Sequence, residues 1–315
     1  MDMTVRTYMK NPLIILLLMI TAINGESLLT GNSMIEHRVE INNHNFAVYE
    51  KKHDSPKDII VFIHGRTISA LPNFDLKVQS KNVSVMDAFF FKNFQVYAMD
   101  MRGFGKTSRD VSGWINPEKA KQDVAGLLEW IIKRHPKSKK PTLFGYSYGS
   151  LVSHFVAQEN PELVSQLVLY GHPIEHTYES RYIQIKGNEV KTEKVPVRRP
   201  NSVEWSSSDF IKDSVEKEVV DAYVSSTLEL DPILADWNKL SQWTQIKPEK
   251  ITVPTLVING AHDPVSPADK LAVFFSEISN SDRAWVIIPN SGHAAHLENS
   301  SGQMINSIVN FIRRK

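Results

Sequence analysis

The sequence predicts an α/β fold with a mostly parallel central sheet flanked by helices. Short, nearly continuous apolar runs recur along the chain, and such runs are typical of strands that are buried on both faces. Amphipathic segments lie between these runs, which indicates that helices connect successive strands. A short apolar leader precedes this body, and one long insertion without a buried strand interrupts it.

An antiparallel hairpin is expected first, because "HRVEIN" and "NFAVYEK" alternate apolar and polar residues around the turn "NHN". Six buried strands should follow it. Their sequences are "DIIVFIHG" (58–65), "FQVYAMD" (94–100), "PTLFG" (141–145), "QLVLYG" (166–171), "PTLVING" (254–260) and "AWVIIPN" (284–290).

Three segments have the apolar spacing of amphipathic helices. The first spans residues 117–135, the second starts directly after the strand at 141–145 and ends before Pro161, and the third closes the chain from residue 301. Each predicted helix follows a predicted strand, as a doubly wound arrangement requires.

Residues 174–250 contain no buried strand, and we expect them to form a lid inserted after the sixth strand. The insertion includes a hairpin-like stretch, "YIQIKGNEVK" (182–191), and two expected helices near 209–226 and 232–243. It also holds Trp205, Trp237 and Trp243. Insertions of this kind above strand ends usually line a functional site. The alternative is a surface excursion with a small core of its own.

Residues 1–25 have the pattern of a signal peptide. Arg6 and Lys10 precede the 12-residue apolar run "PLIILLLMITAI", and the polar, small-residue stretch "NGES" follows it, with cleavage expected after Gly25. The run is shorter than the roughly 20 apolar residues that span a bilayer. We therefore expect one exported domain, residues 26–315, located in the periplasm or secreted. The alternative is an uncleaved anchor, which would be the only route to membrane contact.

Charge and residue composition indicate which classes of partner and cofactor to expect. The formal net charge of +1 gives no reason to expect a nucleic-acid partner. The chain has no cysteine, its histidines are scattered and no H-E-x-x-H motif occurs, so no metal site is predicted.

Ser147 is the candidate nucleophile, in the sequence "GYSYGS". A buried strand precedes it and a helix follows at once, which is the strand–turn–helix setting that the G-x-S-x-G motif requires. Side chains at Gly145 or Gly149 would collide with the strand or helix. The tight turn should expose the hydroxyl, and the helix start favours developing negative charge. An ordinary tight turn is the alternative.

A serine nucleophile needs a base and an acid that orients the base. His293 lies in "PNSGHAAHLEN", the loop after the last predicted strand, and His296 is the rival base. Asp263 lies in "INGAHDPVSP" after the preceding strand, and it is the candidate acid. Asp263 could instead form only an Asx-turn before a proline. Glu175 is the reserve acid.

Two backbone N–H groups should stabilise the oxyanion of the tetrahedral intermediate. Tyr148, the residue after the nucleophile, supplies one, and Arg66 in "FIHGRT" is expected to supply the other. The glycine-containing loop "DMRGFGKTS" (100–108) resembles a phosphate-binding loop, but it lacks the third glycine of a dinucleotide fingerprint. We expect it to be a structural loop beside the site.

Taken together, "HGRT", "DMRGFGKTS", "GYSYGS", "GAHDPVSP" and "SGH" occur in the order found in the α/β-hydrolase superfamily, which the chain resembles over residues 35–315. The resemblance implies a sheet of about eight strands and a Ser-Asp-His triad in the order Ser147, Asp263, His293. It is closest to esterase and lysophospholipase-like members. The "HGGG" form of many lipases is absent.

The resulting hypothesis is an exported serine hydrolase that cleaves a small-molecule or lipid carboxylic ester through an acyl-enzyme and needs no cofactor. Three alternatives stay open on the sequence alone. The same site could serve an amidase or aminopeptidase, in which a lid carboxylate would bind the free amine. It could transfer the acyl group to an acceptor other than water. The chain could also be a non-catalytic binding module on the same scaffold.

Overall fold

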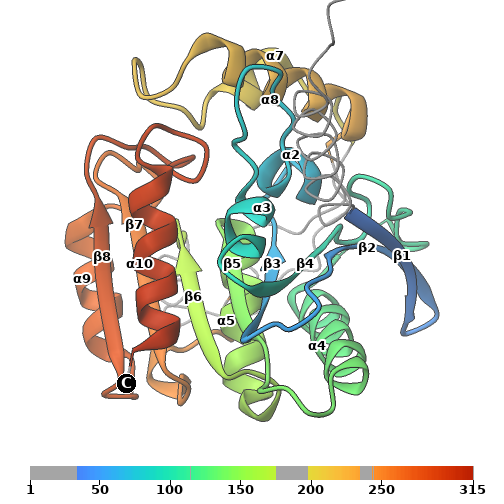
Figure 1. Cartoon of the computed structure of the whole chain (residues 1–315), viewed down its shortest axis with the longest axis vertical. Helices are drawn as coiled ribbons and strands as arrows, with labels where there is room; N and C mark the ends of the chain where they lie inside the picture. Colours follow the sequence, from blue (N-terminus) through green and yellow to red (C-terminus); the bar gives the residue numbers. More distant parts are fainter. Residues whose placement is uncertain (1–33, 114, 175–197, 235–242, 244, 315) are drawn as a thin grey trace, which may run out of the picture.

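An eight-stranded sheet forms the centre of the computed structural model, which describes residues 34–113, 115–174, 198–234, 243 and 245–314. The strand order is β1-β2-β4-β3-β5-β6-β7-β8, and from β4 to β8 all neighbours are parallel (Figure 1). The strands are β1 (Met34–Ile41), β2 (His44–Lys51), β3 (Asp58–Ile63), β4 (Phe94–Met99), β5 (Thr142–Tyr146), β6 (Gln166–Tyr170), β7 (Thr255–Gly260) and β8 (Arg283–Ile288). The predicted fold class is confirmed.

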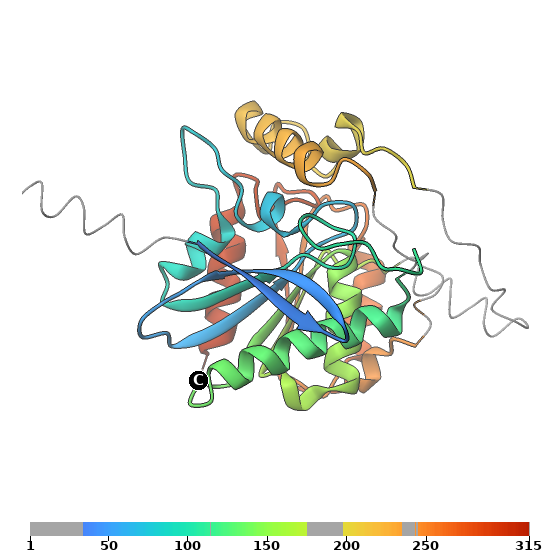
Figure 2. The ribbon, with the colours of Figure 1, turned by 90° about the vertical axis from the view of Figure 1, so that its right-hand side faces the viewer.

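Helices cover both faces of the sheet, and each face has its own hydrophobic core (Figure 2). One face carries α4 (Pro117–Arg134), α5 (Tyr148–Glu159) and α9 (Ala268–Glu277). The other carries α2 (Ala70–Phe74), α3 (Val85–Phe90) and α10 (Ser301–Arg313). Short 3₁₀ turns occur at Pro161–Leu163 and Pro248–Lys250. Because both faces are covered, the exposed place for a site is the carboxyl edge of the parallel strands.

The insertion after β6 places two helices, α7 (Val203–Ser207) and α8 (Lys217–Leu230), over this carboxyl edge (Figures 1 and 2). The predicted helix at 209–226 begins later than expected. Asp213 has a left-handed φ of 62°, which a continuous helix cannot contain. The predicted hairpin at 182–191 and most of the predicted helix at 232–243 lie outside the described residues.

Three further predictions differ from the structure. The hairpin turn is formed by Asn42 and Asn43, one residue earlier than expected, and both have positive φ. Strand β8 is an edge strand, partly exposed along most of its length, although its apolar run predicted burial on both faces. Trp243, counted with the lid, is buried against Tyr148 in the main core.

The predicted signal peptide, residues 1–25, lies outside the described residues. Within the described part of the chain, no helix has the length and hydropathy needed to cross a bilayer.

Candidate active site

Ser147 lies at the junction between β5 and α5, where the chain turns sharply. Its backbone angles are φ 52° and ψ −121°, a conformation rare for a residue with a side chain. The Ser147 N–H donates to the carbonyl of Tyr170 (2.8 Å), and the Ser147 carbonyl accepts from the N–H of Ser150 (2.8 Å). Strand β5 extends to Tyr146, one residue beyond its predicted end, so the turn is confined to Ser147 itself.

The two glycines of the motif are required by close backbone contacts. A β-carbon at Gly145 would lie 2.4 Å from the carbonyl oxygen of Gly149. A β-carbon at Gly149 would lie 2.3 Å from the carbonyl oxygen of Ile63, in the neighbouring strand β3. Gly65 is constrained less severely, since its β-carbon would lie 3.2 Å from Cβ of Ser147, a tight contact and not a clash with backbone. Glycine therefore allows the loop after β3 to pass directly beside the serine.

His293 and Asp263, which are 30 residues apart in sequence, form a buried hydrogen bond. Nδ1 of His293 lies 2.9 Å from Oδ2 of Asp263. The other carboxylate oxygen accepts from the N–H of Val265 (2.9 Å), which fixes the orientation of the acid. With Nδ1 engaged by the carboxylate, Nε2 is the ring nitrogen left to act on a proton in the cavity.

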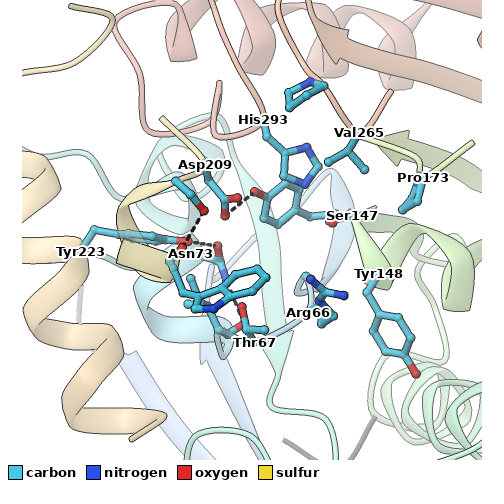
Figure 3. Close-up of a pocket in the computed structure, with 16 residues that line it drawn as sticks. Arg66, Thr67, Asn73, Ser147, Tyr148, Pro173, Asp209, Tyr223, Val265 and His293 are labelled. Carbon is cyan, nitrogen blue, oxygen red and sulfur yellow. Dashed lines mark hydrogen bonds between the residues drawn. The ribbon is translucent and has the colours of Figure 1, made fainter. Parts of the chain in front are cut away.

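Four of the five predicted site residues line one cavity of about 360 Å³, and the fifth, Asp263, is connected to it through its hydrogen bond to His293. Ser147 and His293 both line it (Figure 3), together with Gly65, Arg66 and Tyr148. The Tyr148 ring points away from the cavity and packs on Trp243, so Tyr148 can contribute through its backbone at the start of α5. The guanidinium of Arg66 lies 5.6 Å from the ring centroid of Trp205 in the lid.

His296, the rival base, occupies a different environment. Its ring is buried among the aromatic rings of Phe74, Tyr146 and Tyr170 and does not line the cavity. Burial, helped by the nearby His293, lowers the pKa of His296 to about 3. These contacts indicate a packing role. Glu175, the reserve acid, lies outside the described residues.

Asp209 is a cavity residue that sequence reasoning missed. It follows α7 in the lid, and its carboxylate faces the cavity 3.5 Å from the hydroxyl of Tyr146 (Figure 3). Burial, together with the charge of Asp263, raises the pKa of Asp209 above its usual range. The only sequence signal was a carboxylate in a lid predicted to cover the site, and Glu204, Glu216 and Glu218 shared that signal.

The loop "DMRGFGKTS" is bonded by buried hydrogen bonds to residues 64–70, the segment after β3 that contains Arg66. Asp100 accepts from the N–H groups of Ala70 (2.9 Å) and Lys106 (2.9 Å). Asp231, at the end of α8, accepts from the N–H groups of Ser69 (2.8 Å) and Gly105 (2.8 Å). Two carboxylates thus connect this loop, the segment 64–70 and the lid. Among the described residues, no cluster of His, Asp and Glu side chains is arranged to hold a metal ion.

The chain is similar in sequence to known hydrolases. The chain is 27% identical over 243 residues to 2-hydroxy-6-oxo-6-(2'-aminophenyl)hexa-2,4-dienoic acid hydrolase of Metapseudomonas resinovorans, covering 71% of this chain and 76% of that protein. It is 27% identical over 185 residues to 3-oxoadipate enol-lactonase 2 of Acinetobacter baylyi, covering 57% of this chain and 65% of the relative.

Solved structures share the fold at low sequence identity. An esterase from Thermogutta terrifontis superposes with a TM-score of 0.63 at 18% identity, covering 90% of this chain and 98% of the esterase. The enol-lactonase from Burkholderia xenovorans LB400 gives a TM-score of 0.63 at 15% identity, covering 88% and 99%. The sequence profile described as serine aminopeptidase, S33, matches residues 54–300. The chain therefore belongs to this family of α/β-hydrolase fold hydrolases.

Proposed function

We propose that this chain is a serine hydrolase that cleaves carboxylic esters through an acyl-enzyme on Ser147. The observation that carries the proposal is the buried His293–Asp263 hydrogen bond at a cavity shared with a serine in a strained turn. Relatives that include an enol-lactonase, which by its name opens a cyclic ester, support an ester substrate.

In the proposed reaction, Oγ of Ser147 attacks the ester carbonyl while Nε2 of His293 takes the serine proton. Asp263 keeps the proton of the neutral ring on Nδ1 and stabilises the ring once it is positive. The N–H groups of Tyr148 and Arg66 receive the oxyanion, and removing such a donor typically costs about 3–4 kcal/mol of transition-state stabilisation. His293 then gives its proton to the leaving alcohol. In the second half of the reaction, His293 takes a proton from a water molecule that attacks the acyl-enzyme. His293 then returns this proton to Oγ of Ser147, and the carboxylic acid product leaves.

A series of p-nitrophenyl esters of increasing acyl length, assayed on wild type and Ser147→Ala, tests this proposal. Wild type should hydrolyse at least one ester, and Ser147→Ala should lose up to about 10⁶-fold in kcat if the three groups act as a unit. A matched variant, Ser276→Ala, changes a serine of α9 that does not line the cavity and should retain activity. Undiminished hydrolysis by Ser147→Ala would contradict the proposal.

Aminopeptidase activity is the second candidate, favoured by the Asp209 carboxylate in the cavity and by the name of the matching family. A lid carboxylate at this place could bind the ammonium group of a substrate. Glu216 and Glu218 pair instead with Lys81 and Ser80. Aminoacyl p-nitroanilides with free and acetylated amino groups distinguish the two candidates, because an aminopeptidase would cleave only the free form.

Export is part of the proposal and rests on the pattern of residues 1–25. The N-terminus of the protein recovered from the periplasm or medium should begin near Glu26. Recovery of only the full-length chain, in the cytosol, would contradict it.

A further inference from the structure

The loop that carries His293 is held from both sides of that residue. The N–H of Gly292, just before it, donates to Oε2 of Glu298 (2.8 Å). The N–H of Ala294, just after it, donates to the backbone carbonyl of Asp209 in the lid (3.1 Å). The carbonyl of His293 itself accepts from the hydroxyl of Tyr170 in β6. The position of the imidazole therefore depends on the lid as well as on the sheet.

Glu298 connects the two sides of this arrangement. Its second oxygen, Oε1, accepts from the N–H of Ile211 in the lid (3.2 Å). A neighbouring backbone bond joins the N–H of Asn299 to the carbonyl of Ser214 (2.8 Å). We call residues 209–214 and 292–299, with these bonds, the lid–loop contact. One carboxylate thus holds the base-bearing loop and the lid together.

The packing in the lid–loop contact leaves little freedom. A β-carbon at Gly292 would lie 2.7 Å from Cγ2 of Ile211 and 3.3 Å from the carbonyl oxygen of Asp209. Glu298 is only 1% exposed, and a buried carboxylate is costly unless hydrogen bonds satisfy it. The two backbone N–H groups provide that compensation, and water can replace either bond only if a chain segment moves.

We infer that Glu298 is a positioning residue that couples docking of the lid to the placement of the catalytic base His293. The inference rests on the proposed function, and it concerns how the site is assembled. Glu298 does not line the cavity, so any effect of this residue on the reaction must act through the backbone that it holds. If residues 209–214 move away from the loop that carries His293, the bond from Ala294 to Asp209 breaks. Glu298, which also holds Gly292, loses its bond from Ile211 at the same time.

The test compares Glu298→Gln with Asp123→Asn. The glutamine has the same shape, but its amide group can accept at only one of the two positions. Asp123→Asn serves as the matched control, because it alters another buried carboxylate, bonded to Arg102 away from the cavity. Glu298→Gln should lower kcat on the best p-nitrophenyl ester about 10- to 100-fold with little change in KM. Asp123→Asn should lower Tm without that loss of kcat.

Hydrogen exchange supplies a readout that a purely stabilising role would not produce. In Glu298→Gln, exchange of the Gly292, Ala294 and Ile211 amides should accelerate selectively, while the amides of β6 keep their protection. If Glu298→Gln does not fold, Glu298→Asp, which keeps the charge but shortens the side chain, should show the same pattern.

Unchanged kcat in a folded Glu298 variant, or unchanged exchange at these three amides, would overturn the inference and leave the proposed function intact. A wild type inert towards every ester would overturn the two together, so the two failures are distinguishable.

Discussion

Gly171, the residue after β6, lies directly against the imidazole of His293. A β-carbon at position 171 would be 2.8 Å from Cε1 of the ring and 3.3 Å from Oδ2 of Asp263. The φ of Gly171 is +57°, so a side chain there is disfavoured by the backbone as well.

Gly171→Ala should therefore displace the imidazole and lower kcat by about 100-fold, the typical cost of a 1 Å misplacement of a catalytic group. Steady-state kinetics on a p-nitrophenyl ester measures the loss. Gly302→Ala is the control, since a β-carbon at this position of α10 meets no atom within 4 Å. Equal kcat values in the two variants would show that the ring tolerates the added methyl group.

Asp263→Asn should preserve the fold and reduce kcat about 10⁴-fold. An asparagine can still accept the Val265 N–H, but its amide presents the wrong hydrogen-bonding group to Nδ1 of His293. The measurement is kcat together with thermal unfolding. Asp269→Asn changes an exposed aspartate in the first turn of α9 and should have no effect on kcat. A fully active Asp263→Asn enzyme would exclude Asp263 as the acid.

The pH profile of kcat/KM should report the neutral form of His293. Burial disfavours the charged ring, yet the hydrogen bond and charge of Asp263 and the charge of Asp209 raise the pKa of His293 above 6.5. Since the base must be neutral, the rate should fall as pH drops through that raised value.

Asp209→Asn removes one of the two negative charges and should move this acid limb to lower pH. Glu204→Gln replaces an exposed carboxylate of α7 by a carboxamide, and this control variant should leave the acid limb in place. Identical profiles for wild type and Asp209→Asn would rule out an electrostatic effect of the lid on the base.

His296 should make the protein less stable in acid. Its folded pKa of about 3 lies below the ordinary histidine value of 6.5, so the unfolded chain takes up a proton first as pH falls between these values. The contribution of the neutral His296 ring to the free energy of unfolding is complete above pH 6.5. Roughly 3 kcal/mol of this contribution should be lost by pH 4.

Replacing the ring by a leucine of similar volume, in His296→Leu, should shrink the difference in free energy of unfolding between pH 7 and pH 4 by that amount. Urea titrations at the two pH values measure the difference. An unaltered difference would mean that His296 becomes protonated in the folded protein as easily as in the unfolded chain.

Much of the scaffold could be predicted because it depends on local patterns. The apolar runs that became β3 to β7 are largely buried, and the G-x-S-x-G spacing around Ser147 is a local sequence pattern, although the contact that requires Gly149 comes from Ile63 in β3. The edge position of β8 could not be predicted in this way. A run such as "AWVII" contains nothing that identifies the last strand of a sheet.

The lid was harder to predict because its structure depends on what it docks against. The backbones of Asp209 and Ile211 are bonded to Ala294 and Glu298, more than 80 residues away, and these bonds give the two residues their place in the lid–loop contact. Trp243 was assigned to the lid by sequence position, but it fills a gap in the main core beside Tyr148 and Phe155. Such long-range contacts leave no periodic signal in the chain.

Covalent labelling by a fluorophosphonate tests the central claim, that Ser147 is a nucleophile activated by His293. Peptide mapping of the labelled protein should place one phosphonyl group on Ser147, in the peptide containing "GYSYGS". Ser147→Ala should remain unlabelled, and His293→Ala should react far more slowly. Labelling at another residue, or equal labelling of Ser147→Ala, would contradict the account.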